Sequence, residues 1–127
     1  MTTLFLLFSH AITPDQVEDA QKNWGVESVE SLPTNLQESF SNVPADLEDL
    51  TAHLQPIKDW LLSRAKPTDL VLIQGDFGVT YHLVDFCKKQ GLTAIYATTE
   101  RQSIDTMQPD GSILTQRVFK HKIFRKY

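Results

Sequence analysis

Apolar residues cluster in short runs that predict the strands of one sheet. Residues 3–8, 70–73 and 92–97 are mostly apolar and include many β-branched or bulky side chains. Runs this short and this apolar are typical of strands that are buried on both faces of a parallel sheet. Residues 26–32 alternate apolar and polar side chains and stop at Pro33, which predicts another short strand.

A helix is predicted over residues 13–24, between the first two strands. Thr13 is a favourable N-cap, Pro14 fits the first helical position, and Gln16 stands where it completes a capping box. Gly25 follows the last apolar position, as a glycine does at a helix end. The signals at both ends therefore agree on one helix.

The longest helix is predicted to start at Pro44. Before it, residues 34–43 fit a loop or one short helical piece, because Thr34 and Gln37 have the spacing of a capping box. After Pro44, leucine and isoleucine step by three and four, which makes one apolar stripe. This stripe packs in the core or in part against a second copy of the chain. Pro56 lies inside the segment, and we expect it to kink the helix by removing a backbone donor. The stripe consists of Leu47, Leu50, Leu54, Ile57 and Leu61.

The strand at residues 70–73 leads into a glycine turn and a third helix. Gly75 and Gly78 bracket the turn, and Gly91 stands where a C′ glycine ends the helix. The turn presents backbone N–H groups at a helix N-terminus, where an anion is favoured. The alternative is a plain loop whose glycines serve chain reversal only. The apolar positions of this helix are Val79, Leu83, Phe86 and Cys87.

The order of the elements predicts an α/β fold: a Rossmann-like, mostly parallel sheet with a C-terminal β-hairpin. Residues 103–108 and 112–124 flank a Pro-Asp-Gly turn signal and form the hairpin. Without repeats or linkers, residues 1–127 make a single domain. The strand order starts 2-1-3-4, so a ligand is expected at the carboxyl ends of the first and third strands, where the order reverses.

Charge is distributed unevenly along the chain, whose net charge is −4. Residues 1–100 carry 14 acidic and 6 basic side chains, whereas residues 101–127 carry 2 and 6. An acidic body does not suit a protein that binds duplex nucleic acid. The basic end can hold a small anion, or its side chains can solvate an edge strand. These side chains are Lys120, Lys122, Arg125 and Lys126.

A cytoplasmic location is expected from the single cysteine and the lack of a targeting signal. Cys87 has no partner for a disulfide and falls on the inner face of its helix, which favours a role in the core. The apolar residues 4–8 are too few to span a bilayer and lack the basic flank of a signal peptide. We therefore expect no contact with a membrane.

Polar clusters follow three of the predicted strands, and they carry the candidate chemistry. They are Ser9-His10, residues 74–80 and residues 98–101. The glycine turn has neither a Walker lysine nor a full G-x-G-x-x-G, and the chain has no G-x-S-x-G elbow. No Cys/His set has the spacing of metal ligands, so we expect no metal and no cofactor.

Four blocks of sequence resemble one known family. Residues 4–10 (LFLLFSH), 72–78 (LIQGDFG), 96–101 (YATTER) and 118–127 (VFKHKIFRKY) together are similar to the small stand-alone CARF-related proteins found with type III CRISPR systems. Members of that family are ring nucleases, which bind and cleave cyclic oligoadenylate messengers. The resemblance implies a CARF-like fold and a homodimer that holds the ring, cyclic tetra-adenylate, across its two-fold axis.

The resemblance also implies a metal-independent reaction, in which a ribose 2′-OH attacks the neighbouring phosphate. Ser9 and His10 would contact ribose or phosphate, with His10 as acid or base, and Arg101 would pair with a phosphate. A non-catalytic binder of the same ring is the alternative function. The expected ligand-binding residues are Gln74, Gly75, Asp76, Phe77, Gly78, Thr80, Thr98 and Thr99.

Several of these residues also have a purely structural interpretation. His10 could cap the following helix or bond a backbone carbonyl. Asp76 would repel a phosphate, and we prefer it as the N-cap of the third helix. Thr98 and Thr99 could satisfy backbone groups at a strand end. Arg101 could pair with a neighbouring carboxylate, Glu100 or Asp105.

The other histidines are assigned no role in the chemistry. His53 and His82 fall in predicted helices and are expected to be solvated. His121 and Arg117 lie on the hairpin, and their direction depends on a strand register that the sequence does not fix.

Overall fold

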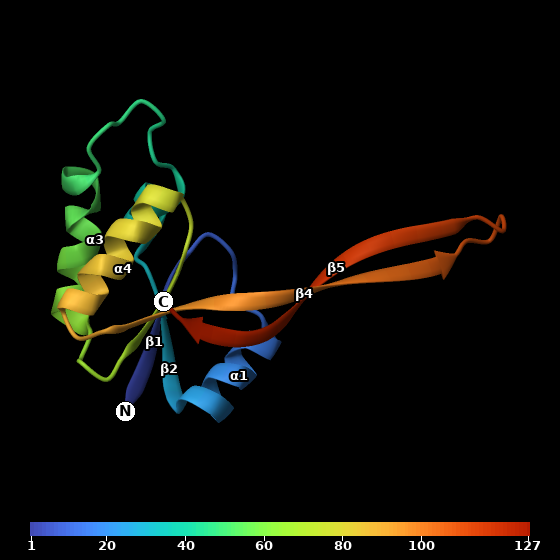
Figure 1. Cartoon of the computed structure of the whole chain (residues 1–127), viewed down its shortest axis with the longest axis horizontal. Coiled ribbons are helices and arrows are strands. Elements are labelled where there is room, and N and C mark those ends of the chain that lie inside the picture. Colours follow the sequence, from blue (N-terminus) through green and yellow to red (C-terminus); the bar gives the residue numbers. More distant parts are fainter.

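Helices cover both faces of one five-stranded sheet, and a long hairpin projects from its edge (Figure 1). The computed structural model describes all 127 residues. The strands are β1 (Thr2–Phe8), β2 (Val26–Ser31), β3 (Leu70–Gln74), β4 (Thr93–Met107) and β5 (Ile113–Lys126). The helices are α1 (Pro14–Trp24), α2 (Thr34–Ser41), α3 (Thr51–Arg64) and α4 (Phe77–Lys89). None of them has the length and apolar character needed to cross a bilayer.

The strand order is β2-β1-β3-β4-β5, which confirms the predicted start 2-1-3-4. The first four strands run parallel, and β5 pairs antiparallel with β4 at the edge. The fold is therefore the Rossmann-like α/β sheet with a C-terminal hairpin that the sequence predicts. The order reverses between β1 and β3, where Phe8 pairs with Gln74 at the last position of both strands.

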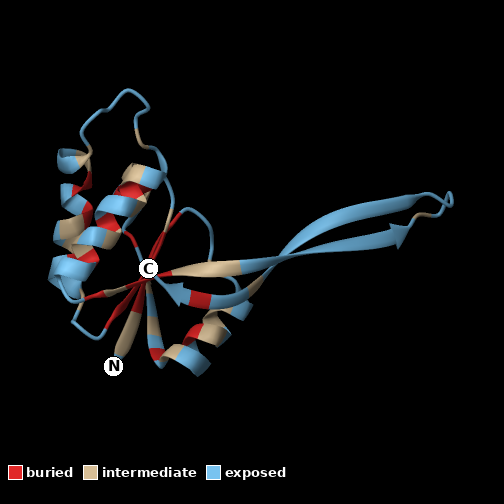
Figure 2. Ribbon diagram, viewed as in Figure 1, coloured by how far each residue is buried: buried red, intermediate tan, exposed pale blue.

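Alternate residues of the central strands build two separate cores. Figure 2 shows buried residues on the central strands and on helices of both faces. Val71 and Ile73 face α2, α3 and α4, whereas Leu70 and Leu72 face α1. All four are buried, as expected for a parallel strand covered on both sides. This packing fixes the register of β3 and thereby the position of the turn that follows it.

The predicted ends of α1 and α4 are confirmed. Thr13 Oγ1 accepts from the Gln16 amide at 3.2 Å, and Gln16 Oε1 accepts from the Thr13 amide at 2.9 Å, which completes the capping box. At the other end of α1, Gly25 has φ +66°, where a glycine is favoured. After α4, Gly91 has φ +75° and the Leu92 amide donates to the Cys87 carbonyl at 2.9 Å, as in a Schellman motif.

The predicted start of the longest helix is wrong. α3 begins at Thr51, and Leu47 is 39% exposed instead of belonging to the buried stripe. The chain turns at Pro44, whose carbonyl accepts from the Leu47 amide at 3.2 Å, and Asp49 Oδ1 then accepts from the Thr51 amide at 2.9 Å. This Asx turn at Asp49 leads into α3, whose N-cap is Leu50 and has no side-chain cap. Pro56 lies inside α3 without ending it.

Residues 34–43 contain α2, but not through the capping box that Thr34 and Gln37 suggest. Pro33 stands at the N-cap and no side chain caps the helix. The Gln37 Nε2 group instead donates to the Phe8 carbonyl at 3.1 Å, at the end of β1. A tertiary hydrogen bond of the Gln37 side chain has thus replaced the local one.

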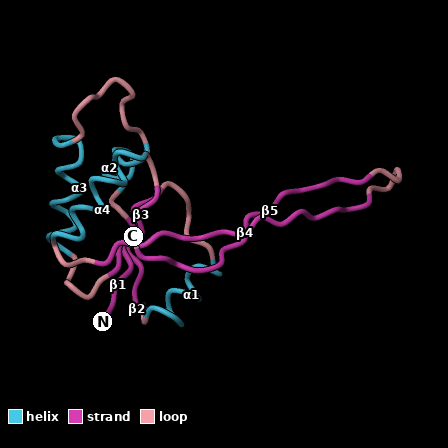
Figure 3. The backbone as a smooth tube through the Cα atoms, viewed as in Figure 1, coloured by secondary structure: helices cyan, strands magenta, loops and turns pink.

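β4 does not end after residue 97, as the sequence predicts, but runs on to Met107. It pairs with β5 from Ile95 opposite Lys126 to Met107 opposite Ile113, with one register shift between Ala97 and Thr99. Residues 98–107 contain no glycine or proline, so nothing in the backbone stops the pairing. Beyond the parallel sheet the two strands form a ribbon that contacts α1 at its base, and we call this ribbon the arm: residues 99–121 (Figure 3).

Cys87 is completely buried in the core beside α3, and burial raises the pKa of its thiol to about 12. Because the thiolate is the reactive form, we expect a disulfide reagent such as DTNB to leave the folded protein unmodified. One thiol equivalent should react once guanidinium unfolds the chain. Reaction within minutes under native conditions would show that the core opens around α4.

Candidate functional site

The ends of β1 and β3 place two of the three predicted polar clusters side by side. Phe8 and Gln74 are register partners, so Ser9-His10 and the turn at Gly75 leave the sheet at adjacent positions. Both clusters lie where the strand order reverses, which is the usual ligand position of such sheets. This junction is the candidate site.

The glycine turn presents unpaired amide groups at the N-terminus of α4. Asp76 Oδ1 accepts from the Val79 amide at 3.0 Å and is the N-cap, as we preferred from the sequence. The amides from Gly75 to Gly78 make no hydrogen bond within the chain. Four free donors at a helix N-terminus favour an oxyanion such as a phosphate.

The glycines of this turn are needed for close packing, not for an unusual backbone angle. Neither has positive φ. A Cβ at Gly75 would lie 2.9 Å from Phe40 Cζ, and one at Gly78 would lie 3.1 Å from Leu50 Cδ1. Phe40 is buried, so the turn rests directly on the core. The glycines therefore serve close packing, and the anion-binding role of the turn stays a prediction.

Ser9 is exposed but already engaged. Its hydroxyl shares a 2.9 Å hydrogen bond with Ser41 Oγ, and Ser41 Oγ also accepts from Gln37 Nε2 at 3.0 Å. This chain of contacts fixes the end of β1 to α2. Ser9 thus has a positioning role in the structure, and a contact with ligand would compete with Ser41.

His10 is exposed and makes no hydrogen bond within the chain; only its ring lies against Phe8, with centroids 6.3 Å apart. Thr13 caps α1, which excludes His10 as that cap. The structural alternatives for His10 are therefore wrong. The imidazole is free to meet a ligand at the end of β1.

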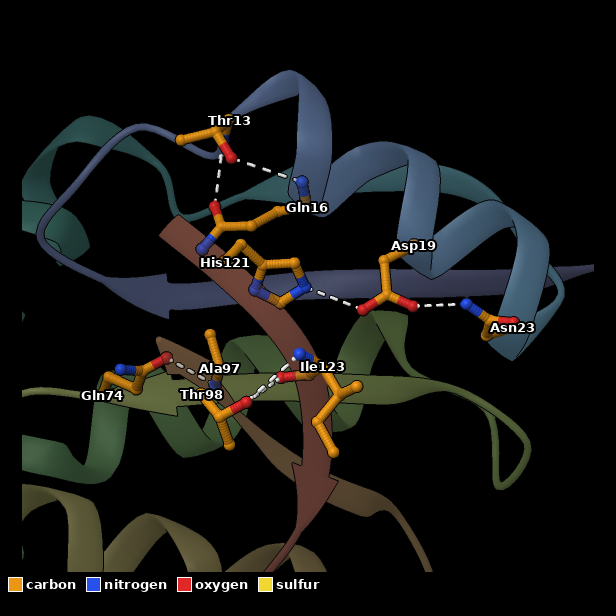
Figure 4. A network of polar contacts seen from close by, with 9 residues as sticks. All are labelled: Thr13, Gln16, Asp19, Asn23, Gln74, Ala97, Thr98, His121 and Ile123. Carbon is orange, nitrogen blue, oxygen red and sulfur yellow. Dashed lines mark hydrogen bonds and ion pairs between the residues drawn. The ribbon is translucent and has the colours of Figure 1, made fainter. Parts of the chain in front are cut away.

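The third polar cluster lies within a strand and has a largely structural use. Gln74 Oε1 accepts from the Ala97 amide at 2.8 Å, which joins β3 to β4 (Figure 4). Thr98 Oγ1 donates to the Ile123 carbonyl and accepts from its amide, both at 3.1 Å, where the ladder is irregular. Gln74 and Thr98 therefore satisfy backbone groups of the sheet.

Arg101 lies on the arm and not beside the glycine turn. Its guanidinium stacks over the Phe119 ring at 5.3 Å, and no carboxylate pairs with it. Lys122 instead pairs with Glu100 at 2.7 Å and thereby lowers the pKa of that carboxyl group. By strand alternation Arg101 shares a face of the ribbon with Thr99 and His121, on the α1 side of the sheet.

Sequence reasoning missed a buried pair that joins the arm to α1. His121 Nε2 lies 2.7 Å from Asp19 Oδ2, and their side chains are only 5% and 11% exposed. Asn23 Nδ2 donates to the other Asp19 oxygen at 2.7 Å (Figure 4). His121 Nδ1, which points away from Asp19, is buried without a partner. The sequence offered one signal for this pair: Asp19 adjoins the apolar Ala20, which is buried in the structure.

The remaining histidines differ from each other. His82 is exposed, as expected. His53 is partly buried and its Nε2 contacts the Ser39 carbonyl at 2.8 Å, so the expectation of a solvated side chain is wrong. This contact ties α3 to α2.

Phe77 and Thr80 occupy the first turns of α4 with opposite exposure. The Phe77 side chain is 95% exposed, although it follows the glycine turn directly. Thr80 Oγ1 is buried and has no hydrogen-bond partner. Both residues border a hollow of about 260 Å³ that also touches Gly75 and Tyr127.

The basic residues of β5 lie on an edge strand, in line with the simpler of their two interpretations. Lys122 is paired with Glu100, and Lys126 lies 6.0 Å above the Trp24 ring. Arg125 differs, because its Nη1 donates to the Tyr96 hydroxyl at 2.9 Å, close to the hollow beside the glycine turn. It is the cation of β5 that is best placed to approach a ligand there.

Comparison with known proteins gives one family. Residues 2–125 match the family model described as "Uncharacterized protein MJ1673 family". The chain is 51% identical to the "Uncharacterized protein MJ1673" of Methanocaldococcus jannaschii, over 100% of this chain and 98% of that protein. No solved structure matches the chain.

Proposed function

We propose that this chain, which belongs to the MJ1673 family, is a cytoplasmic ring nuclease that binds and cleaves cyclic tetra-adenylate and so ends type III CRISPR signalling. The observation that carries the proposal is the junction of β1 and β3. There, the free imidazole of His10 and the unpaired amides of Gly75–Gly78 leave the sheet at adjacent positions. The resemblance of the four sequence blocks supplies the ligand class.

The geometry suits cleavage in which the substrate supplies its own nucleophile. The ribose 2′-oxygen bonds to the adjacent phosphorus, the bond from phosphorus to the 5′-oxygen breaks, and the products are a 2′,3′-cyclic phosphate and a 5′-OH. His10 takes the proton of the 2′-OH and returns it to the leaving 5′-oxygen. The amides of the glycine turn hydrogen-bond the phosphoryl oxygens, where each aimed donor is worth about 3–4 kcal/mol in the transition state.

The other predicted site residues divide into support and ligand contact. Gln74, Asp76 and Thr98 hold the backbone around the site through the hydrogen bonds described above. The phosphate contact assigned to Arg101 stays a prediction, because within one copy the arm carries this side chain away from the glycine turn.

A homodimer is part of the proposal, and the arm supports it. A two-stranded ribbon is marginally stable alone in water. One face of the arm carries the exposed Ile104, Leu114 and Val118 with only uncharged residues between them. An apolar face on an unsupported ribbon favours packing against a second copy.

Cyclic tetra-adenylate should be converted to linear di-adenylate by the purified protein in the presence of EDTA. The reaction needs no metal because the ribose 2′-OH is the nucleophile and the backbone amides of the glycine turn donate hydrogen bonds to the phosphate. Liquid chromatography of the products, with 2′,3′-cyclic phosphate ends identified by mass, measures it. An intact ring after long incubation at equimolar protein would contradict cleavage.

Binding without cleavage is the second candidate, and one observation favours it. Ser9 is bonded to Ser41, and His10 is the only unbonded ionisable side chain of the two clusters at the junction. A site with one such group holds a phosphate more readily than it cleaves one. Calorimetry that shows tight binding, combined with an intact ring in the chromatogram, would establish this function.

A further inference from the structure

An exposed aromatic pair marks the start of α4. Phe77 is 95% exposed and Tyr81, one turn later on the same face, is 64% exposed. Phenylalanine is normally among the most buried residues, so a nearly bare side chain beside a candidate phosphate site needs an explanation. Phe77 makes no contact with another ring, whereas the buried Phe5 packs edge-on against Trp60.

The aromatic pair borders a hollow with a rigid opposite wall. Two adjoining hollows, of about 340 Å³ and 260 Å³, share Phe77, Thr80 and Tyr127. The Tyr127 ring lies 4.8 Å from that of Tyr96, and its hydroxyl donates to the Ile73 carbonyl. The wall is therefore fixed to β3 and β4, while Phe77 forms the open side.

Polar groups in the hollow fit a heteroaromatic ring. Thr80 borders both hollows, and its Oγ1 is buried without a partner, which is uncommon for a buried polar atom. The one carboxylate at the rim, Asp85, is paired with Lys89 at 2.9 Å. Lys88 borders the larger hollow, and Arg125 is held by the hydroxyl of Tyr96, which borders the smaller one.

We propose that this hollow is the base subsite, in which Phe77 and Tyr81 stack on an adenine whose phosphate lies on the glycine turn. The inference rests on the proposed function. Gly75 and Phe77 border the smaller hollow, and Phe77 and Tyr81 border the larger one that adjoins it, so one nucleotide spanning both reaches the glycine turn and the two rings. Aromatic side chains next to a phosphate site are the usual means of holding unpaired bases.

The test is calorimetry with cyclic tetra-adenylate on the wild type, Phe77→Ala, Phe77→Trp and the control Leu62→Ala. Leu62 is a 51% exposed apolar residue of α3, outside the hollow. We expect Phe77→Ala to weaken binding by about 10-fold or more, Phe77→Trp to restore it, and Leu62→Ala to leave it unchanged. Light scattering on the same samples follows the oligomeric state.

The outcomes separate this inference from the function on which it rests. If the wild type does not bind the ring, the proposed function fails. If the wild type binds and Phe77→Ala binds within two-fold, the base subsite is wrong and the function stands. If Phe77→Ala changes a dimer to a monomer, the aromatic pair is a subunit contact and the base subsite is wrong. If the wild type binds tightly, Phe77→Ala binds about 10-fold more weakly, Phe77→Trp restores the affinity and the molecular mass stays constant, the base subsite is supported.

Discussion

His10→Ala is expected to slow cleavage of cyclic tetra-adenylate by about 10²–10⁴-fold while changing its dissociation constant by less than about three-fold. His10 is the only ionisable side chain at the end of β1 that makes no hydrogen bond within the chain. Removing it takes away the group that moves the proton between the 2′-OH and the 5′-oxygen. The amides of Gly75–Gly78, which hold the phosphate, remain in place.

Single-turnover cleavage, followed by chromatography, measures the rate, and calorimetry measures the affinity. His82→Ala is the matched control for the rate, because His82 is also an exposed histidine but lies on α4 outside the hollow, with its ring 5.5 Å from that of Tyr81. The cleavage rate at saturating ring should stay at the wild-type value in that variant. A His10→Ala rate within three-fold of the wild type would rule out an acid–base role. A large loss of affinity would instead make His10 a binding residue.

Asp69→Ala is expected to lower the free energy of unfolding by about 3–5 kcal/mol, a large part of the stability of a domain this size. Asp69 is the one charged residue that is fully buried, at 2% exposure. Its Oδ1 accepts from the Thr3 amide at 2.9 Å and its Oδ2 from the Lys66 amide at 2.8 Å. Without the carboxylate, two amides lose their acceptors at the point where β1 begins and β3 follows α3.

Urea denaturation followed by circular dichroism gives the free energy of unfolding for each variant. Asp59→Ala is the matched control, since Asp59 is exposed on α3 and accepts only from Gln55 at 2.9 Å. It should change the stability by less than about 0.5 kcal/mol. Asp69→Asn keeps one acceptor oxygen, so its free energy of unfolding should lie between those of Asp69→Ala and Asp59→Ala. A loss below 1 kcal/mol in Asp69→Ala would mean that water replaces both hydrogen bonds.

Local patterns predicted the elements whose causes are local. The capping box at Thr13 and Gln16, and the glycines at positions 25 and 91, act within a few residues of each other, so they give the ends of α1 and α4. The same patterns failed where a distant group competes. Gln37 has the spacing of a capping residue, but its side-chain amide donates to the Phe8 carbonyl at the end of β1.

The candidate site shows the same division. The sequence predicts that residues 9–10 and 74–78 meet, because a parallel strand order brings those strand ends together. The sequence also predicts Arg101 at this site, because it predicts that the strand ends after residue 97. In the structure, pairing with β5 extends β4 past Arg101 and carries this side chain away from the site. That pairing depends on a turn at Gly111, ten residues beyond Arg101.

The sequence by itself determined the strand order, the two-sided burial of the sheet and the edge at which ligands are expected. Apolar runs and capping residues give the order of strands and helices, and this alternating order allows few topologies. Only the tertiary structure decided which polar residues there are free. It bonds Ser9 to Ser41, leaves His10 and Phe77 exposed, and buries His121 against Asp19. Such outcomes depend on contacts between distant segments, and strand register and helix packing determine these contacts after the elements have formed.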